Sequence, residues 1–238
     1  MSAAERTISI PAILIHWTPA IASGFLVNLG ISMLAMALTT LLGTLLGVGA
    51  LARHSWLRHA CAGYTHFFQN APWLVILFYC MLLLPFRLHL GVLALPLPDW
   101  LKAVFGITLG ALANMAEIVR AALRSIPSGQ WESSDAMAFT RTQTLWLIAL
   151  PQCVRRMLPA WVNLYALVVI STPLCAVVGV HEGMSAVADM LAFHDRPGLL
   201  LPAYAYLLTI FFVCCYPIAR GAQRLERALH SGDSLVDR

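Results

Sequence analysis

Long stretches of this chain contain no charged residue at all. Four such gaps lie between the pairs Arg6 and Arg53, Arg58 and Arg87, Arg156 and Glu182, and Arg196 and Arg220. An ordinary soluble domain is about 25% charged, whereas this chain of 238 residues is 11% charged and 60% hydrophobic. A membrane-spanning helix needs about 20 mostly apolar residues, and each gap can hold one. These features predict a multi-pass membrane protein, neither soluble nor disordered.

We predict an all-α integral membrane protein with five transmembrane helices. A fifth apolar run, Leu101–Leu123, is also long enough to span, although Glu117 and Arg120 lie near its end. The five spans are expected near residues 21–51, 72–92, 101–123, 158–178 and 199–218. Ile8–Pro19 is expected to approach the membrane at headgroup level. The whole chain, residues 1–238, is predicted to form one transmembrane domain without a cleaved signal peptide.

The arginines predict the orientation of these spans. Alternate connections carry eleven basic residues on one side and four on the other. Because positive residues stay preferentially on the cytoplasmic side, the N-terminus is expected outside and the C-terminus in the cytoplasm. The longest polar connection, at about residues 124–156, is then cytoplasmic.

This cytoplasmic connection is too long and too patterned for a simple turn. After a break at Ser125–Gly129, the segment Gln130–Phe139 has the pattern of a short amphipathic helix, and Ser128 could cap its start. A second short helix, Thr142–Leu150, is expected to end at Pro151. Two small helices between two spans predict an organised cytoplasmic surface.

Four polar residues at membrane depth are candidates for lining a translocation pathway. Glu117 and Arg120 are three residues apart, so they share a helix face and can pair. Ser171 and Thr172 precede Pro173, whose missing backbone N–H is expected to break the fourth span. Ionisable groups within a span usually face the bundle interior or a wet cavity. The alternatives are a structural ion pair at the interface and an ordinary proline kink.

The sequence argues against nucleotide binding and metal chemistry in this chain. Lys102 is the single lysine and follows Leu101, so there is no Gly-Lys-Ser/Thr of a P-loop. If the work is driven by ATP, another subunit must bind it. The six cysteines show no zinc-binding spacing. His54 and His59 form one loose pair, most simply interpreted as solvated loop histidines, and the net charge of +4 gives no indication of nucleic acid.

The cytoplasmic connection resembles the EAA loop of permease subunits of ABC importers, with the pattern E-A-A-x3-G-x9-I-x-L-P. Glu132, Ile148, Leu150 and Pro151 match it, while Ser133, Ser134 and Ala138 replace its Ala, Ala and Gly. Neighbouring segments resemble the polar amino acid uptake subfamily: Ala116–Arg120, Ile126–Glu132, Leu150–Gln152, Leu158–Asn163, Phe68–Pro72 and Arg224–Arg227. Gln69 stands where the family often has Arg, and Ile170–Leu174 where it has a Lys-Asp-Thr-Ser-Leu run.

The resemblance implies a type I ABC importer permease fold in a bacterial cytoplasmic (inner) membrane. It also implies a transport subunit rather than an enzyme, for a polar amino acid or similar small solute. The partners would be ABC ATPase subunits, an extracytoplasmic (periplasmic) binding protein and a second permease, identical or not. ATP and Mg would be held by the ATPase, and this chain would hold no cofactor. The resemblance places ATPase coupling on Gln130, Trp131, Glu132, Ser133, Asp135, Ala138, Ile148, Leu150 and Pro151.

Two other functions remain open at this point. One is a stand-alone secondary transporter or channel, which would move solute without a partner ATPase. The other is a membrane enzyme that holds a metal through its histidines.

Overall fold

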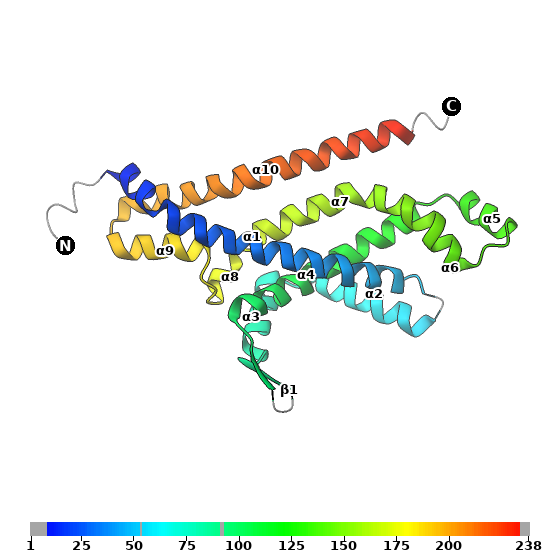
Figure 1. Cartoon of the computed structure of the whole chain (residues 1–238), viewed down its shortest axis with the longest axis horizontal. Coiled ribbons are helices and arrows are strands. Elements are labelled where there is room, and N and C mark those ends of the chain that lie inside the picture. The colour runs from blue at the N-terminus through cyan, green and yellow to red at the C-terminus, as the bar shows by residue number, and fades with distance from the viewer. Residues whose placement is uncertain (1–8, 53, 91–92, 234–238) are drawn as a thin grey trace. The chain divides into compact units, whose positions relative to one another are not determined.

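The computed structural model describes residues 9–52, 54–90 and 93–233. Its main helices are α1 (Ile10–Gly49), α2 (Ser55–Asn70), α3 (Trp73–Leu83), α4 (Asp99–Arg124), α5 (Ser128–Ala136), α7 (Leu150–Ser171), α9 (Gly183–His194) and α10 (Leu200–Asp233) (Figure 1). Shorter elements are strands β1 (Arg87–Leu90) and β2 (Leu93–Pro96), helices α6 (Arg141–Gln143) and α8 (Leu174–Val177), the π-helix η2 (Thr144–Ala149) and the 3-10 helix η3 (Pro197–Leu199).

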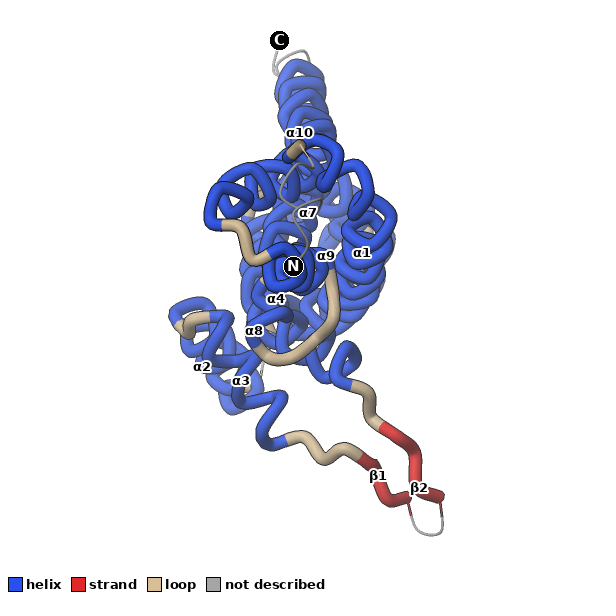
Figure 2. Tube along the Cα trace, turned by 90° about the vertical axis from the view of Figure 1, so that its left-hand side faces the viewer, coloured by secondary structure: helices blue, strands red, loops and turns tan. Residues whose placement is uncertain are grey.

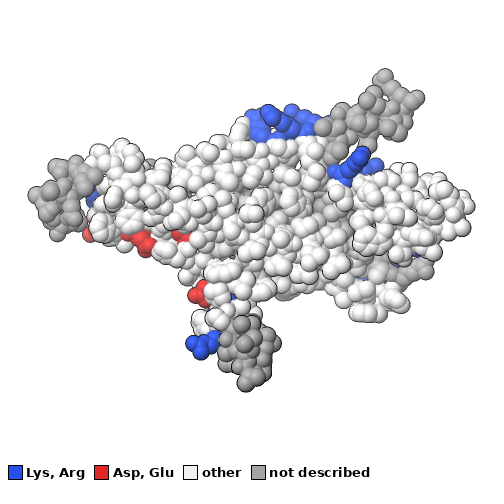
Figure 3. Space-filling model, in the orientation of Figure 1, with Lys and Arg blue, Asp and Glu red and all other residues white. Residues whose placement is uncertain are grey.

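The all-α prediction is confirmed, with one small exception. Four described stretches are long and apolar enough to cross a membrane: Ile10–Gly49, Asp99–Arg124, Arg141–Val177 and Pro197–Arg227. Helices α2 and α3 pass the same test only as a pair, so the described chain has four spans, or up to five. The exception is the β1–β2 hairpin, drawn red in Figure 2. Most of the face visible in Figure 3 bears neither Lys and Arg nor Asp and Glu, as a lipid-facing chain requires.

The second predicted span, residues 72–92, is wrong in extent. Helix α3 ends at Leu83, and the following residues pair as an antiparallel hairpin in which Arg87 faces Pro96. The segment before it, expected to be a loop, is instead helix α2. That helix ends at Asn70. The next residue, Ala71, is extended with ψ 132°, because a residue that precedes proline is disfavoured in the helical region.

Other boundaries also differ from the sequence prediction. From Ile10 onward, the expected interfacial approach is continuous with α1, and Pro19 lies inside that helix; Ile8 lies outside the described residues. The predicted break near Pro173 is confirmed, since α7 ends at Ser171 and α8 begins at Leu174.

The described chain divides into two compact units, each assembled from three segments. Unit 1 draws on residues 1–35, 73–107 and 168–216, and unit 2 on residues 36–72, 108–167 and 217–238.

In unit 1, the beginning of α1 is held by polar and aromatic contacts. Thr18 and Tyr206 share a hydroxyl hydrogen bond of 2.9 Å, and the Trp17 indole N–H donates to His194 Nε2 at 3.3 Å. The rings of Phe25 and Phe211 meet edge to face. Figure 1 shows α9, in yellow, beside the blue beginning of α1.

The only lysine of the chain is buried in unit 1. Lys102 Nζ lies 3.3 Å from Asp99 Oδ1 and 3.7 Å from the centre of the Phe86 ring. Its alignment with the carboxylate is that of an ion pair and does not meet hydrogen-bond geometry. The cation therefore joins the first turn of α4 to the chain entering the hairpin, through a charge pair and a cation–π contact.

In unit 2, α1 packs on α4 through two glycines one helical turn apart. A Cβ added to Gly43 would lie 2.6 Å from the Cβ of Met115, and one added to Gly47 would lie 2.7 Å from the carbonyl oxygen of Ala116. Small residues at this spacing let membrane helices approach backbone to backbone. The Trp161 indole adds an interhelical hydrogen bond of 2.8 Å to Thr40 Oγ1.

Candidate functional site

The connection between α4 and α7, all within unit 2, forms the first candidate site. Helix α5 starts after Pro127, and Ser128 is its first residue; no side-chain cap is formed there, so the predicted capping role of Ser128 is wrong. The hydroxyl of buried Ser134 donates to the carbonyl oxygen of Gln130 at 2.6 Å. Glu132, Ser133 and Asp135 are exposed, and Trp131 is half-buried.

Ala138 ends this helix in a left-handed conformation. Its φ is +57°, a value that only glycine adopts without cost. The N–H of Phe139 donates to the Ser134 carbonyl at 3.0 Å, and the N–H of Ala138 donates to the Asp135 carbonyl at 3.0 Å. These two bonds define a Schellman motif with Ala138 at its left-handed position. The glycine of the EAA pattern is thus explained by backbone conformation, and not only by the small size inferred from the sequence.

The second predicted helix of the connection begins with a well-formed cap, but it does not end at Pro151 as predicted. Thr140 and Gln143 form a reciprocal capping box, with Gln143 N donating to Thr140 Oγ1 at 3.3 Å. The chain then runs through α6 and η2 directly into α7, so the helix expected to end at Pro151 continues through it. A π-helical segment next to a proline is a known way for a helix to absorb the lost N–H.

We call the surface formed by α5, the turn after it and η2 the α5–η2 surface. Three large apolar side chains are exposed there: Met137 at 59%, Trp146 at 63% and Leu147 at 65%. Met137 lies within the segment Gln130–Phe139 that was expected to be an amphipathic helix, whereas Trp146 and Leu147 were not singled out. Trp131, Phe139, Ile148 and Leu150 are half-buried, and Pro151 is exposed.

The two ends of this connection are tied to each other. Nη1 of Arg156 on α7 donates to the Ser125 carbonyl oxygen at 2.7 Å and to its hydroxyl at 3.0 Å. Ser125 directly follows α4, so the bond closes the base of the α5–η2 surface.

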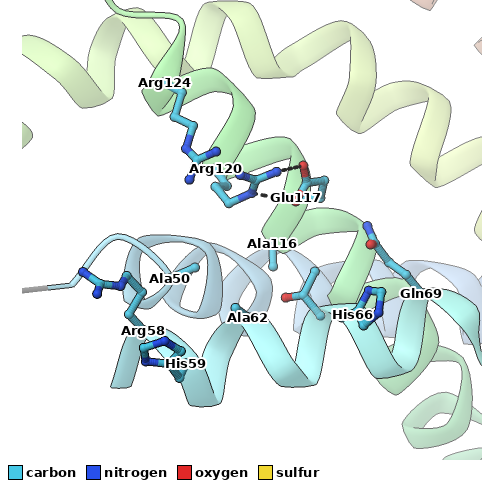
Figure 4. A pocket seen from close by; sticks show the side chains of 11 residues that line it. Ala50, Arg58, His59, Ala62, His66, Gln69, Ala116, Glu117, Arg120 and Arg124 are labelled. Atoms are coloured by element: carbon cyan, nitrogen blue, oxygen red, sulfur yellow. Dashed lines mark hydrogen bonds and ion pairs between the residues drawn. The ribbon is translucent and has the colours of Figure 1, made fainter. Parts of the chain in front are cut away.

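A second candidate site is a cavity of about 480 Å³, also within unit 2, which we call the basic cavity. Helix α2 contributes Arg58 and several uncharged polar side chains, α4 contributes Glu117, Arg120 and Arg124, and alanines form much of the remaining lining (Figure 4). The lining residues are Ala50, Arg58, His59, Ala62, Thr65, His66, Gln69, Ala116, Glu117, Arg120 and Arg124.

Glu117 and Arg120 form the predicted ion pair inside this cavity. Arg120 Nε donates to Glu117 Oε2 at 2.8 Å, and Arg120 Nη2 contacts Glu117 Oε1. Figure 4 shows the pair on α4, facing α2. His59 and His66, expected on a loop, lie on the helix α2 that borders the cavity.

The other two predicted pathway residues belong to unit 1. Ser171 is half-buried at the end of α7, and Thr172 is fully buried. Thr172 accepts a hydrogen bond of 3.0 Å from the Asn28 amide and donates one of 2.7 Å to the Val169 carbonyl. The pathway role of all four residues remains a prediction.

Thr172 belongs to a buried polar cluster that the sequence analysis missed. Glu182, fully buried, caps α9 by accepting from the N–H groups of Met184 and Ser185 and from the Asn28 amide. Burial raises the pKa of the Glu182 carboxyl, while these hydrogen bonds act in the opposite direction. The sequence offers no signal for this cap, because Ser, Thr, Asp and Asn are the usual N-cap residues and glutamate is not one of them.

A family model described as "Binding-protein-dependent transport system inner membrane component" matches residues 39–229. The chain belongs to this family. The matched range includes both the α5–η2 surface and the basic cavity. A multi-pass membrane protein that serves as a transport subunit is therefore established, and the predicted resemblance to ABC importer permeases is confirmed.

Curated relatives of this transport component carry related names. An inner membrane amino-acid ABC transporter permease protein of Escherichia coli is 25% identical over 190 residues, which cover 80% of this chain and 51% of the relative. A probable glutamine ABC transporter permease protein of Bacillus subtilis is 27% identical over 203 residues, covering 85% of this chain and 90% of the relative. The chain thus spans about half the length of the first relative and most of the second.

Two solved structures show the same fold. An amino acid ABC transporter crystallised with histidines has a TM-score of 0.79 at 18% identity, covering 93% of this chain and 99% of the other. A methionine ABC transporter in an inward-facing conformation has a TM-score of 0.71 at 19% identity, covering 87% and 95%. The type I importer permease fold is confirmed, and the relatives support neither a stand-alone transporter nor a metal-dependent enzyme.

Proposed function

We propose that this chain is the permease subunit of an ABC importer that carries a polar amino acid or a similar small solute across a bacterial inner membrane. ATP and Mg are bound by separate ATPase subunits. An extracytoplasmic binding protein delivers the solute, and a second permease, identical or related, completes the pathway. The names of the relatives, which specify amino-acid and glutamine transport, support this substrate class.

The observation that carries the proposal is the exposed apolar part of the α5–η2 surface. Met137, Trp146 and Leu147 each leave more than half of their surface uncovered on a short, capped and hydrogen-bonded structure. On the orientation predicted from the arginines these side chains lie on the cytoplasmic side, where contact with water is unfavourable. Aromatic anchors in a partner's pocket commonly contribute about 2 kcal/mol or more to binding. A groove on an ATPase subunit would cover them.

The rigidity of this surface fits the transmission of motion. The capping box at Thr140 and the Schellman motif at Ala138 fix the turn within it, and the Arg156–Ser125 bonds tie its end at α7 to its end at α4. A fixed lever passes a movement of the ATPase to α4 and α7, whereas a flexible loop would absorb it. Exposed Glu132 and Asp135 on α5 add a polar rim for partner arginines or lysines.

The test is copurification of the ATPase with the permease, followed by ATP-driven uptake in proteoliposomes. Trp146→Ala and Glu132→Lys should each weaken ATPase retention or uptake by about tenfold or more, because both change the docking surface. Two changes away from this surface are the controls. Trp100→Ala removes a partly exposed tryptophan from the first turn of α4, and Ala188→Lys adds a lysine at an exposed position of α9; both should behave as wild type.

Two results would contradict the proposal. One is full ATPase retention and uptake in both α5–η2 variants. The other is solute uptake by the permease alone in liposomes, which would establish a stand-alone transporter. Uptake should be measured with a panel of amino acids supplied with the binding protein, because the chain alone does not select among them.

A further inference from the structure

The basic cavity in unit 2 carries a net positive charge. Three arginines and a single glutamate line it, which gives a formal charge of +2 with both histidines neutral. Gln69 and Thr65 add neutral donors, and no lysine contributes. Alanines at 50, 62 and 116 leave the space open.

The one carboxylate in the cavity is already neutralised. Glu117 receives hydrogen bonds from Nε and Nη2 of Arg120, so its charge is matched by a fork of donors. The side chains of Arg58 and Arg124 make no hydrogen bond or ion pair with any residue that the structure describes. Their guanidinium groups, together with Nη1 of Arg120, are therefore the donors available to a ligand (Figure 4).

The chemistry of these donors selects an oxyanion. The guanidinium group is planar and always charged, and its fork of N–H groups matches the oxygens of phosphate or carboxylate. Several arginines around one cavity suit a phosphate group, because the oxygens of a phosphodiester point in different directions from a tetrahedral centre and can be reached by more than one guanidinium group.

Helix α2 indicates where that phosphate comes from. Its cavity side bears Arg58, His59, His66 and Gln69, while Trp56 and Phe67 are 70% and 67% exposed. Trp56 and Phe67 are about three turns apart, so they lie on the same side of the helix as each other. This side differs from the one that borders the cavity. A helix with a cationic face beside exposed aromatic residues is typical of the membrane interface, where basic pockets between helices hold lipid headgroups.

We propose that the basic cavity binds the phosphate of an anionic phospholipid, with Arg58 and Arg124 as its main ligands. The acyl chains would lie along the exposed aromatic side of α2. On the orientation predicted from the arginines, this lipid belongs to the cytoplasmic leaflet. The proposal does not depend on which solute is transported.

The test uses the purified full chain in detergent, with lipid added back. Retained lipid is counted by native mass spectrometry, and the melting temperature is measured with phosphatidylglycerol, phosphatidylcholine, inorganic phosphate or glutamate. Phosphatidylglycerol alone should be retained and should raise the melting temperature. The double variant Arg58→Gln/Arg124→Gln should lower its affinity by about tenfold or more, since charge-assisted hydrogen bonds are lost.

Arg155→Gln is the matched control, because Arg155 is an exposed arginine of unit 2 that does not line the cavity. It should retain phosphatidylglycerol as wild type does. Equal retention of phosphatidylcholine, or unchanged binding in the double variant, would overturn the proposal. Stabilisation by inorganic phosphate equal to that by the lipid would assign the cavity to a soluble phosphate instead. Stabilisation by glutamate would assign it to the transported solute.

Discussion

The side-chain amide of Asn28 joins α1 to the start of α9 by two hydrogen bonds. Its nitrogen donates to Glu182 Oε2 at 2.6 Å, and its oxygen accepts from the Gly183 N–H at 3.0 Å. Asn28 and Glu182 are both fully buried. Because both ends of the amide are used, truncating either side chain would leave a buried polar group unpaired.

Gly24 makes this junction possible, and its replacement should destabilise unit 1. A Cβ at Gly24 would lie 2.7 Å from the backbone carbon of Glu182, which cannot move without breaking the cap of α9. We expect Gly24→Ala to cost about 1–3 kcal/mol of stability. Thermal unfolding of the purified chain in detergent measures this.

Gly30 provides the control on the same helix. No atom lies within 4 Å of a Cβ built there, so Gly30→Ala should be neutral or stabilising by up to about 1 kcal/mol. Equal melting temperatures for the two variants would show that α1 and α9 do not pack as closely as described.

The buried Glu182 carboxyl should make stability depend on pH. Burial raises its pKa above the ordinary value of 4.5, so just above pH 4.5 the folded protein keeps a proton that the unfolded chain has released. Unfolding then releases a proton, and stability falls as pH rises from 4.5 to the folded-state pKa. The melting temperature of wild type should decrease over this window relative to that of Glu182→Gln, which cannot titrate. Parallel profiles for the two proteins would contradict this assignment.

The sequence predicted most of the spans because charge-free runs follow directly from the cost of burying charge in lipid. It failed between residues 72 and 92, where apolar residues continue past Leu83 but the chain turns into a hairpin. Hydropathy alone cannot distinguish these conformations. The break at Pro173 was predictable, since a missing N–H acts locally.

In the candidate sites, likewise, local features were predictable from the sequence and features that depend on tertiary structure were not. The spacing of Glu117 and Arg120 was sufficient to predict their pairing. The basic cavity was not foreseen, because it requires α2 to be a helix that presents Arg58 and Gln69 to α4. The Asn28–Glu182 pair joins residues that lie far apart in the sequence, and no local pattern indicates such a contact.

Replacing Ala138 with glycine should stabilise the protein. The left-handed backbone at φ +57° costs an L-residue roughly 1–2 kcal/mol, and glycine removes most of that strain. Ala138→Gly should therefore raise stability by about 1 kcal/mol, measured by thermal unfolding, and leave ATPase retention intact. Gly129→Ala is a contrasting change on α5, since a Cβ there meets no atom within 4 Å and the residue is helical. A loss of stability in Ala138→Gly would mean that the Schellman motif does not form.

The bonds between Arg156 and Ser125 should be needed for coupling more than for assembly. They close the base of the α5–η2 surface, which remains able to dock when they are lost. Arg156→Gln should therefore keep the ATPase bound but lower the solute transported per ATP hydrolysed. If losing these hydrogen bonds at an exposed site costs about 1 kcal/mol, the solute transported per ATP hydrolysed should fall about fivefold. Ser125→Ala should have a smaller effect, because the carbonyl acceptor remains. Arg155→Gln changes the adjacent exposed arginine and should transport normally. If Arg156→Gln and Arg155→Gln give the same ratio of transport to ATP hydrolysis, coupling does not depend on the bonds between Arg156 and Ser125.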